Sequence, residues 1–127
     1  ADARAHIAGC LARLPDTWAP TSVIGIGGTP ASLAAVRLGR PLADAAAIHG
    51  QRLSRGEVVR QIELYSRLTV PERQALPGLH PDRAGVILAG ALLVAAAMDR
   101  LGSAEVVVSI HGLRQGLLSD RFEPGPP

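Results

Sequence analysis

The strongest constraint on the fold is a pair of short β-branched runs with helical patterns between them. Residues 22–26 and 106–110 have the valine and isoleucine content of strands. A strand, a helical crossover and a second strand imply a parallel pair with a right-handed connection. Two parallel strands do not make a stable sheet alone, and no other segment has a clear strand pattern. We therefore expect an α/β fold of short parallel strands covered by helices, completed by a region before Ala1 or by a partner chain.

Helix signals fill the chain between and around these runs. Residues 30–38 are apolar on every side, so this helix is expected to be buried, with Thr29 as its cap, Pro30 in its first position and Gly39 as its stop. Residues 40–53 have the character of a loop, with a short extended piece around Ile48 as the alternative. The other predicted helices cover residues 3–14, 54–68, a short segment from 69, residues 83–101 and residues 112–119. Gly102 is the expected stop of the helix over 83–101. Capping-box patterns are expected at Ser54 with Glu57 and at Thr69 with Glu72.

The amino-acid composition excludes several kinds of chemistry. Every basic residue is arginine, so the chain has no Schiff-base lysine and no GK[ST] phosphate loop. Trp18, Tyr65 and Phe122 are too few for a base-stacking surface, and nucleic acid is not an expected partner. The single cysteine, Cys10, allows neither an internal disulfide nor a cysteine-based zinc site. The four histidines lack metal-ligand spacing, so surface or satisfied-core histidines and no metal site are expected.

Patterns of hydropathy argue against a membrane protein. The longest uncharged apolar run, residues 84–98, is shorter than the ~20 residues that cross a bilayer, and it predicts a buried core helix. Charged residues interrupt the first segment, which therefore does not read as a signal peptide, and a cytoplasmic location is expected. Residues 122–127 are rich in proline and glycine, and this composition predicts a flexible tail.

Both predicted strands run into glycine-containing turns that precede helices. After the first come Gly27, Gly28 and Thr29, where glycines allow close backbone approach and free N–H groups attract anions. A plain tight turn with a capped helix is the alternative. The turn is not a dinucleotide fingerprint, because Pro30 stands where the third glycine would fall. Ligands of open parallel sheets collect at such strand ends, and this favours a cleft here.

Two arginines stand at predicted helix starts. Arg83 lies in a first helical turn, where a cation opposes the helix dipole. It either pairs with its neighbour Asp82 or is held at a cleft to meet phosphate or a base. Arg114 follows Gly112 at the end of the second strand. No G-x-S-x-G elbow and no pair of carboxylates suited to acid–base work accompany them, so the chain is expected to bind and not to catalyse.

Four ordered stretches resemble the Ppx/GppA family of exopolyphosphatases and guanosine pentaphosphate phosphohydrolases. The resemblance implies a partial ribonuclease-H-like domain of the actin-like ATPase superfamily, with residues 1–127 as the C-terminal portion of the second domain. It also implies release of the terminal phosphate of polyphosphate or pppGpp, usually with Mg²⁺. The stretches are VIGIGGTPASLAA (residues 23–35), IHGQRLS (48–54), LPGLHPDRAGVILAGALLV (76–94) and VVVSIHGLRQGLLSDR (106–121).

Carried over by position, the resemblance assigns roles to five residues. Gly27, Gly28 and Thr29 match the glycine turn on the nucleotide side of the family's cleft. Arg83 matches an arginine near bound nucleotide or phosphate. Arg114 matches a Gly-Leu-Arg motif, with either a structural role or a place in the site. The catalytic glutamate, the phosphate loops that the family carries before this region and the ligands of Mg²⁺ would lie outside this chain.

Two other classes of function are also consistent with the sequence. The glycine turn and Arg83 without a catalytic base also fit a non-catalytic nucleotide- or alarmone-binding module. The incomplete sheet also fits a structural or dimerising α/β piece, in which a homodimer would supply the missing strands.

Overall fold

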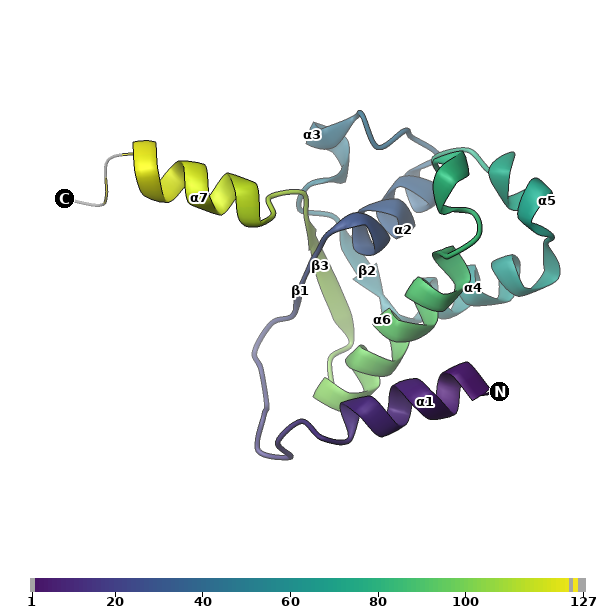
Figure 1. Cartoon of the computed structure of the whole chain (residues 1–127), viewed down its shortest axis with the longest axis horizontal. Helices are drawn as coiled ribbons and strands as arrows, with labels where there is room; N and C mark the ends of the chain where they lie inside the picture. Colours follow the sequence, from purple (N-terminus) through teal and green to yellow (C-terminus); the bar gives the residue numbers. More distant parts are fainter. Residues whose placement is uncertain (1, 124, 126–127) are drawn as a thin grey trace.

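A small mixed sheet with helices on one face organises the chain, which a computed structural model describes at residues 2–123 and 125 (Figure 1). The predicted tail falls partly on residues 124, 126 and 127, which lie outside the described residues, while Phe122 is the last residue of a helix. The strands are β1 (Ile24–Ile26), β2 (Arg52–Ser54) and β3 (Glu105–Ser109). The helices are α1 (Asp2–Leu11), α2 (Gly28–Leu38), α3 (Ala45–Ile48), α4 (Arg55–Arg67), α5 (Val70–Gln74), the 3₁₀ helix η1 (Pro81–Arg83), α6 (Ile87–Leu101) and α7 (Leu113–Phe122).

The strand order is β1-β3-β2, with the last strand of the sequence in the middle. β1 and β3 are parallel, as predicted, with Ile24 opposite Val107. β2 pairs antiparallel with β3 and places Leu53 opposite Val106. The prediction of a loop over residues 40–53, and of no third strand, was therefore wrong. A three-residue strand has too little alternation to be read locally, and its pairing with β3 is what holds it extended.

Helix ends follow the predicted signals in most places. Gly39 and Gly102 end α2 and α6 in the left-handed conformation, each with φ 64°. Thr69 and Glu72 make a reciprocal capping box at the start of α5. The expected Thr29 cap was wrong, because α2 already begins at Gly28 and no side chain caps it.

The predicted helix over residues 83–101 begins later than expected. Residues 81–83 form the separate 3₁₀ turn η1, and α6 starts only at Ile87. His80 caps the 3₁₀ turn, since its Nδ1 accepts a hydrogen bond from the Asp82 N–H at 3.2 Å. Arg83 therefore belongs to a turn that precedes α6 and not to the first turn of α6 itself.

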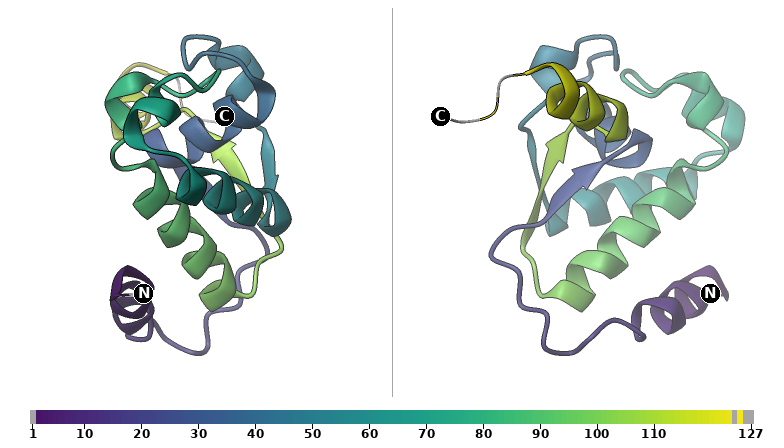
Figure 2. Two further views of the ribbon diagram at one scale, coloured as in Figure 1. Left: turned by 90° about the vertical axis from the view of Figure 1, so that its right-hand side faces the viewer. Right: turned by 60° about the vertical axis from the view of Figure 1, so that its left-hand side comes forward.

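The core lies between the sheet and the helices α2, α4 and α6, which pack against one another (Figure 2). As predicted, α2 is buried through most of its length. A polar link crosses this core: the buried amide of Gln61 donates to the Leu33 carbonyl at 2.8 Å and accepts from the Tyr65 hydroxyl at 2.6 Å. Within the described part of the chain, no helix is both long and apolar enough to cross a bilayer.

The opposite face of the sheet is exposed. Ile24 and Ile26 of β1 remain 62% and 57% exposed, although both are apolar strand residues. α7 extends away from the helical layer (Figure 1) and buries none of its residues. Its apolar side chains are open to solvent as well, with Leu113 79% and Phe122 78% exposed. Within the described residues, no second layer of structure covers this face of the sheet or the apolar side of α7.

Ser32 gives a prediction about stability. This residue of α2 is fully buried, and its hydroxyl has no hydrogen-bond partner in the described part of the chain. Burying an unpaired hydroxyl costs roughly 1–3 kcal/mol. We expect Ser32→Ala to raise the free energy of unfolding by about 1 kcal/mol in urea titrations. The matched control is Ser54→Ala, which removes the α4 cap bonded to the Glu57 N–H and should lower stability by about 1 kcal/mol. A less stable Ser32→Ala protein would contradict the prediction.

Candidate anion-binding site

The turn between β1 and α2 exposes two backbone donors at a helix start. Gly27 has φ 96° and ψ −174°, a conformation that side-chain-bearing residues rarely adopt. No side chain caps α2, and Pro30 has no N–H to offer. Among the described residues, the N–H groups of Gly28 and Thr29 therefore meet no acceptor. Free N–H groups at the start of a helix carry a partial positive charge that attracts anions.

The Arg83 side chain lies directly over this turn. A Cβ built on Gly28 would lie 1.9 Å from Nη2 and 2.0 Å from Cζ of Arg83. The guanidinium therefore occupies the space that any side chain at position 28 would need. The structure thus brings together Gly28 and Arg83, two of the residues predicted for the site, from segments far apart in the sequence.

Arg83 differs from the other partly buried arginines in having no acceptor. Arg73 donates to the carbonyls of Tyr65 and a second residue, and Arg100 donates to two carbonyls and to the Asp16 carboxylate. Within residues 2–123 the half-buried Arg83 guanidinium makes no hydrogen bond or ion pair with another residue. A guanidinium that has lost part of its water without gaining an acceptor is suited to take an anionic ligand.

The alternative interpretation, in which Arg83 pairs with Asp82, is not observed. The Asp82 N–H donates to His80, and the Asp82 carboxylate lies 3.8 Å from the same ring nitrogen. The 3₁₀ turn thus directs Asp82 toward His80 while Arg83 reaches back over the glycine turn.

Thr29 belongs to the turn in a different way from the one predicted. Its side chain packs against Gly90, the fourth residue of α6, with no hydrogen bond to the α2 backbone. The group that Thr29 offers at the helix start is therefore its N–H and not its hydroxyl.

Arg114 is not brought to this turn. It stands exposed in the first turn of α7 and lines a separate open hollow of about 490 Å³ with Ile110, Gly112 and Gln115. The sequence placed it correctly after the end of β3. It did not reveal that α7 leaves the sheet instead of packing beside α2 (Figure 1).

The sequence analysis missed a histidine pair at the same end of the sheet. His49 and His111 stack with ring centroids 4.3 Å apart and an interplanar angle of 26°. The Ile110 N–H donates to His49 Nδ1 at 3.2 Å, so His49 is a satisfied histidine, as expected. No local sequence pattern predicts the stacking, because the pairing of β2 with β3 must be known before the segments of His49 and His111 can be placed together.

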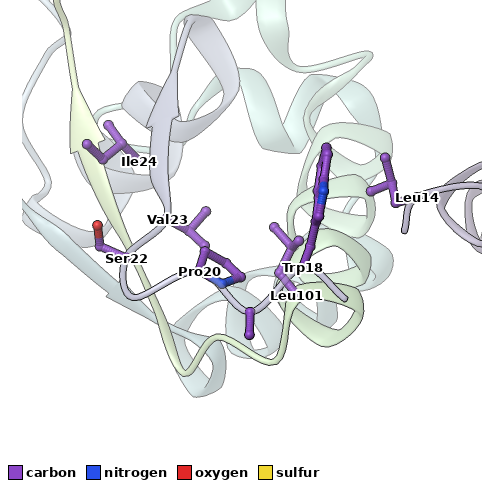
Figure 3. Close-up of a pocket in the computed structure, with 8 residues that line it drawn as sticks. Leu14, Trp18, Pro20, Ser22, Val23, Ile24 and Leu101 are labelled. Carbon is purple, nitrogen blue, oxygen red and sulfur yellow. The ribbon is translucent and has the colours of Figure 1, made fainter. Parts of the chain in front are cut away.

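One surface hollow away from the glycine turn has a mainly apolar lining. An open hollow of about 520 Å³ lies beside the segment that leads into β1, where Trp18, Val23 and Leu101 surround the space (Figure 3). Its lining contains no titratable side chain. In the described ranges, no group of three or more histidine, cysteine or carboxylate side chains is arranged to hold a metal ion. The donor set of the described residues therefore does not fit Mg²⁺.

The carboxylates with shifted pKa values serve the helical surface and not the glycine turn. The hydrogen bond from Arg60 lowers the pKa of Glu57 below 4.5. The Thr69 backbone N–H lowers the pKa of Glu72, and Arg55 lowers that of Asp99 below 3.8. These groups hold caps and helix pairs in place.

The same carboxylates predict the response of stability to acid. A carboxylate with a depressed pKa in the folded state stabilises the fold above its unfolded pKa, and this contribution is lost as the pH falls through the folded value. We therefore expect the Tm to fall as the pH is lowered from about 5 to about 3, measured by thermal melts followed by circular dichroism. A Glu57→Gln, Asp99→Asn double variant should have a lower Tm at neutral pH and a weaker dependence on pH. An unchanged wild-type Tm over this range would contradict the assignment.

Similarity to known proteins identifies the family of the chain. The model of the Ppx/GppA phosphatase family matches residues 2–123, almost the whole chain. The chain belongs to the Ppx/GppA phosphatase family. Exopolyphosphatase 2 of Mycobacterium tuberculosis is 32% identical over 108 residues, which cover 82% of this chain and 32% of the relative. The Ppx/GppA chain thus spans about a third of the length of this curated relative.

Solved structures agree in fold. The Aquifex aeolicus Ppx/GppA family member superposes with a TM-score of 0.84 at 24% identity, covering 94% of this chain and 39% of that one. An exopolyphosphatase from Cytophaga hutchinsonii superposes with a TM-score of 0.72 at 23% identity, covering 92% and 40%. The α/β fold expected from the sequence is therefore that of part of a Ppx/GppA protein.

Proposed function

We propose that this Ppx/GppA chain forms the phosphate-binding wall of an exopolyphosphatase or pppGpp phosphohydrolase. The observation that carries the proposal is Arg83, a half-buried guanidinium without an acceptor in the described chain, lying over Gly28 where α2 begins. Membership of the family and similarity to a protein named exopolyphosphatase 2 support the substrate class. Release of the terminal phosphate is the proposed reaction of the complete enzyme.

In this proposal the chain binds and orients the substrate. The N–H groups of Gly28 and Thr29 and the Arg83 guanidinium would together donate to phosphate oxygens. Rigid donors of this kind neutralise charge on a phosphate chain and fix its terminal group for in-line attack by water. We place the glutamate that would activate this water, and the ligands that would hold Mg²⁺, in a region outside this chain.

The proposal is tested by separating binding from turnover. Isothermal titration of the chain with tripolyphosphate, and in parallel with pppGpp, should give saturable binding with one site per chain. Phosphate-release assays with polyphosphate and Mg²⁺ should give no turnover. The absence of binding at millimolar tripolyphosphate and pppGpp would contradict the phosphate wall, and robust turnover would contradict the placement of the catalytic glutamate elsewhere.

A partner for the exposed face of the sheet is a further part of this proposal. Ile24 and Ile26 leave an apolar strand face uncovered, and the curated relative is about three times as long as the matching segment. A region preceding this chain in the complete protein is the proposed cover, and a cytoplasmic location is proposed with it. Sedimentation of the isolated chain provides the check. A stable homodimer that buries this face would indicate that a second copy of the chain, and not a preceding region, covers it.

A further inference from the structure

We propose that Gly90 of α6 is a positioning residue for the candidate phosphate site. Its missing side chain makes room for Thr29, and this contact fixes the start of α2 beside Arg83. The inference rests on the proposed function, since it concerns how the two donor groups of that site are held in register.

The contact between Gly90 and Thr29 is steric. A Cβ built on Gly90 would lie 2.6 Å from Thr29 Oγ1, 2.7 Å from its Cγ2 and 3.2 Å from its Cβ. The first two distances are too short for any real side chain. The Thr29 side chain is thus seated in a notch on α6 that exists only because residue 90 is glycine.

Backbone conformation does not account for this glycine. Gly90 is not among the glycines with positive φ, and its N–H donates to the Val86 carbonyl at 3.0 Å. Glycine in a helix interior is less stable than alanine by about 1 kcal/mol. The position therefore carries a local cost that the seating of Thr29 explains.

Two neighbouring residues at the start of α2 dock on one short segment of the chain. Arg83 of η1 lies over Gly28, and Gly90, one helical turn into α6, receives Thr29. The segment from Arg83 to Gly90 thereby holds the two free N–H groups and the guanidinium at a fixed separation. Fixed donors bind without having to be ordered at the moment of binding, which strengthens affinity.

Gly90→Ala tests the role directly. The added methyl group should displace Thr29 and shift the start of α2, lowering the Tm by roughly 5–10 °C. Affinity for tripolyphosphate, measured by calorimetry at a temperature where the variant is folded, should fall roughly tenfold. Thr29→Ala alone should lose less affinity than Gly90→Ala, because it removes the contact with Gly90 but keeps the donating N–H and introduces no steric overlap. The double variant Gly90→Ala, Thr29→Ala should recover the affinity of Thr29→Ala, since the two Thr29 atoms that would lie within 3.0 Å of the added methyl group are gone.

Gly9→Ala is the matched control. Gly9 also lies inside a helix, α1, but a Cβ there would meet nothing within 4 Å, so affinity and Tm should not fall. Unchanged binding by Gly90→Ala would overturn the inference while leaving the proposed function intact. A loss in Thr29→Ala equal to that in Gly90→Ala, without recovery in the double variant, would overturn it too, because the hydroxyl would then be a direct ligand. Failure of the wild-type chain to bind tripolyphosphate would instead reject the proposed function.

Discussion

Replacing Arg83 with glutamine is expected to weaken tripolyphosphate binding by roughly 10- to 100-fold, the effect of losing a charge-assisted hydrogen bond. Glutamine removes the charge while keeping a polar side chain of moderate length over Gly28. The fold should be preserved, because Arg83 makes no hydrogen bond or ion pair within the described residues that the substitution would break. Calorimetry gives the affinity and a thermal melt gives the stability. Increasing salt should weaken wild-type binding more than binding by the variant.

Arg67→Gln is the control for this substitution. Arg67 is an exposed arginine in the last turn of α4, so the variant has the same change in net charge at a different place. Its affinity for tripolyphosphate should remain within about twofold of wild type if the long-range field contributes little. An equal loss in both variants would show that binding follows net charge, and the specific role of Arg83 would then be withdrawn.

Replacing Gly78 with alanine is expected to have the largest effect on stability. Gly78 has φ 90°, and a Cβ there would lie 2.3 Å from the Ala35 carbonyl oxygen and 3.0 Å from that of Arg40. These are backbone atoms in the last turn of α2 and just beyond its end, so they cannot move as a side chain can. Left-handed strain and overpacking together predict a loss of roughly 2–5 kcal/mol in the free energy of unfolding. Urea titration with circular dichroism measures this loss.

Gly50→Ala separates the two causes. Gly50 has a similar φ of 82°, but a Cβ there would meet nothing within 4 Å. Only the conformational strain remains, and the expected loss is about 1–2 kcal/mol. If Gly78→Ala and Gly50→Ala lower the free energy of unfolding by the same amount, the close approach of Gly78 to α2 does not contribute to the loss, and overpacking is not its cause.

Local chemistry explains which parts of the fold were predictable. The ends of α2 and α6 were correct because Gly39 and Gly102 each end a helix by adopting the left-handed conformation on their own. The capping box of Thr69 and Glu72 was correct for the same reason, since all of its hydrogen bonds lie within four residues. Signals of this kind need no knowledge of distant segments.

The parts that failed depend on distant segments. β2 is extended because it pairs with β3, and its three residues carry no pattern of their own. Threonine is a residue type that often caps helices, but the Thr29 side chain packs against Gly90 instead. Gly78 and Gly90 gave no functional signal either, because the need for glycine there arises from atoms of α2 that only the folded structure brings near.

The candidate site was predicted in outline. The glycine turn and its position after a strand followed from the sequence, and Arg83 followed from its place at a helix start and from the resemblance. Two features could be seen only in the structure: the Arg83 guanidinium lies over Gly28, and Arg83 does not pair with Asp82. The position of Arg114 depends on the direction in which α7 leaves the sheet, and no local sequence pattern predicts this direction.

The central position of β3 bears on how this chain is made. β1 and β2 are both synthesised before β3, and neither pairs with the other. Among the described strands, neither has a sheet partner until the residues from Glu105 onward have left the ribosome, whereas the α4 and α6 sequences are already complete. The helices can therefore pack before the sheet forms on the ribosome, and a nascent chain stopped before β3 would display the β1 and β2 segments without their β3 partner.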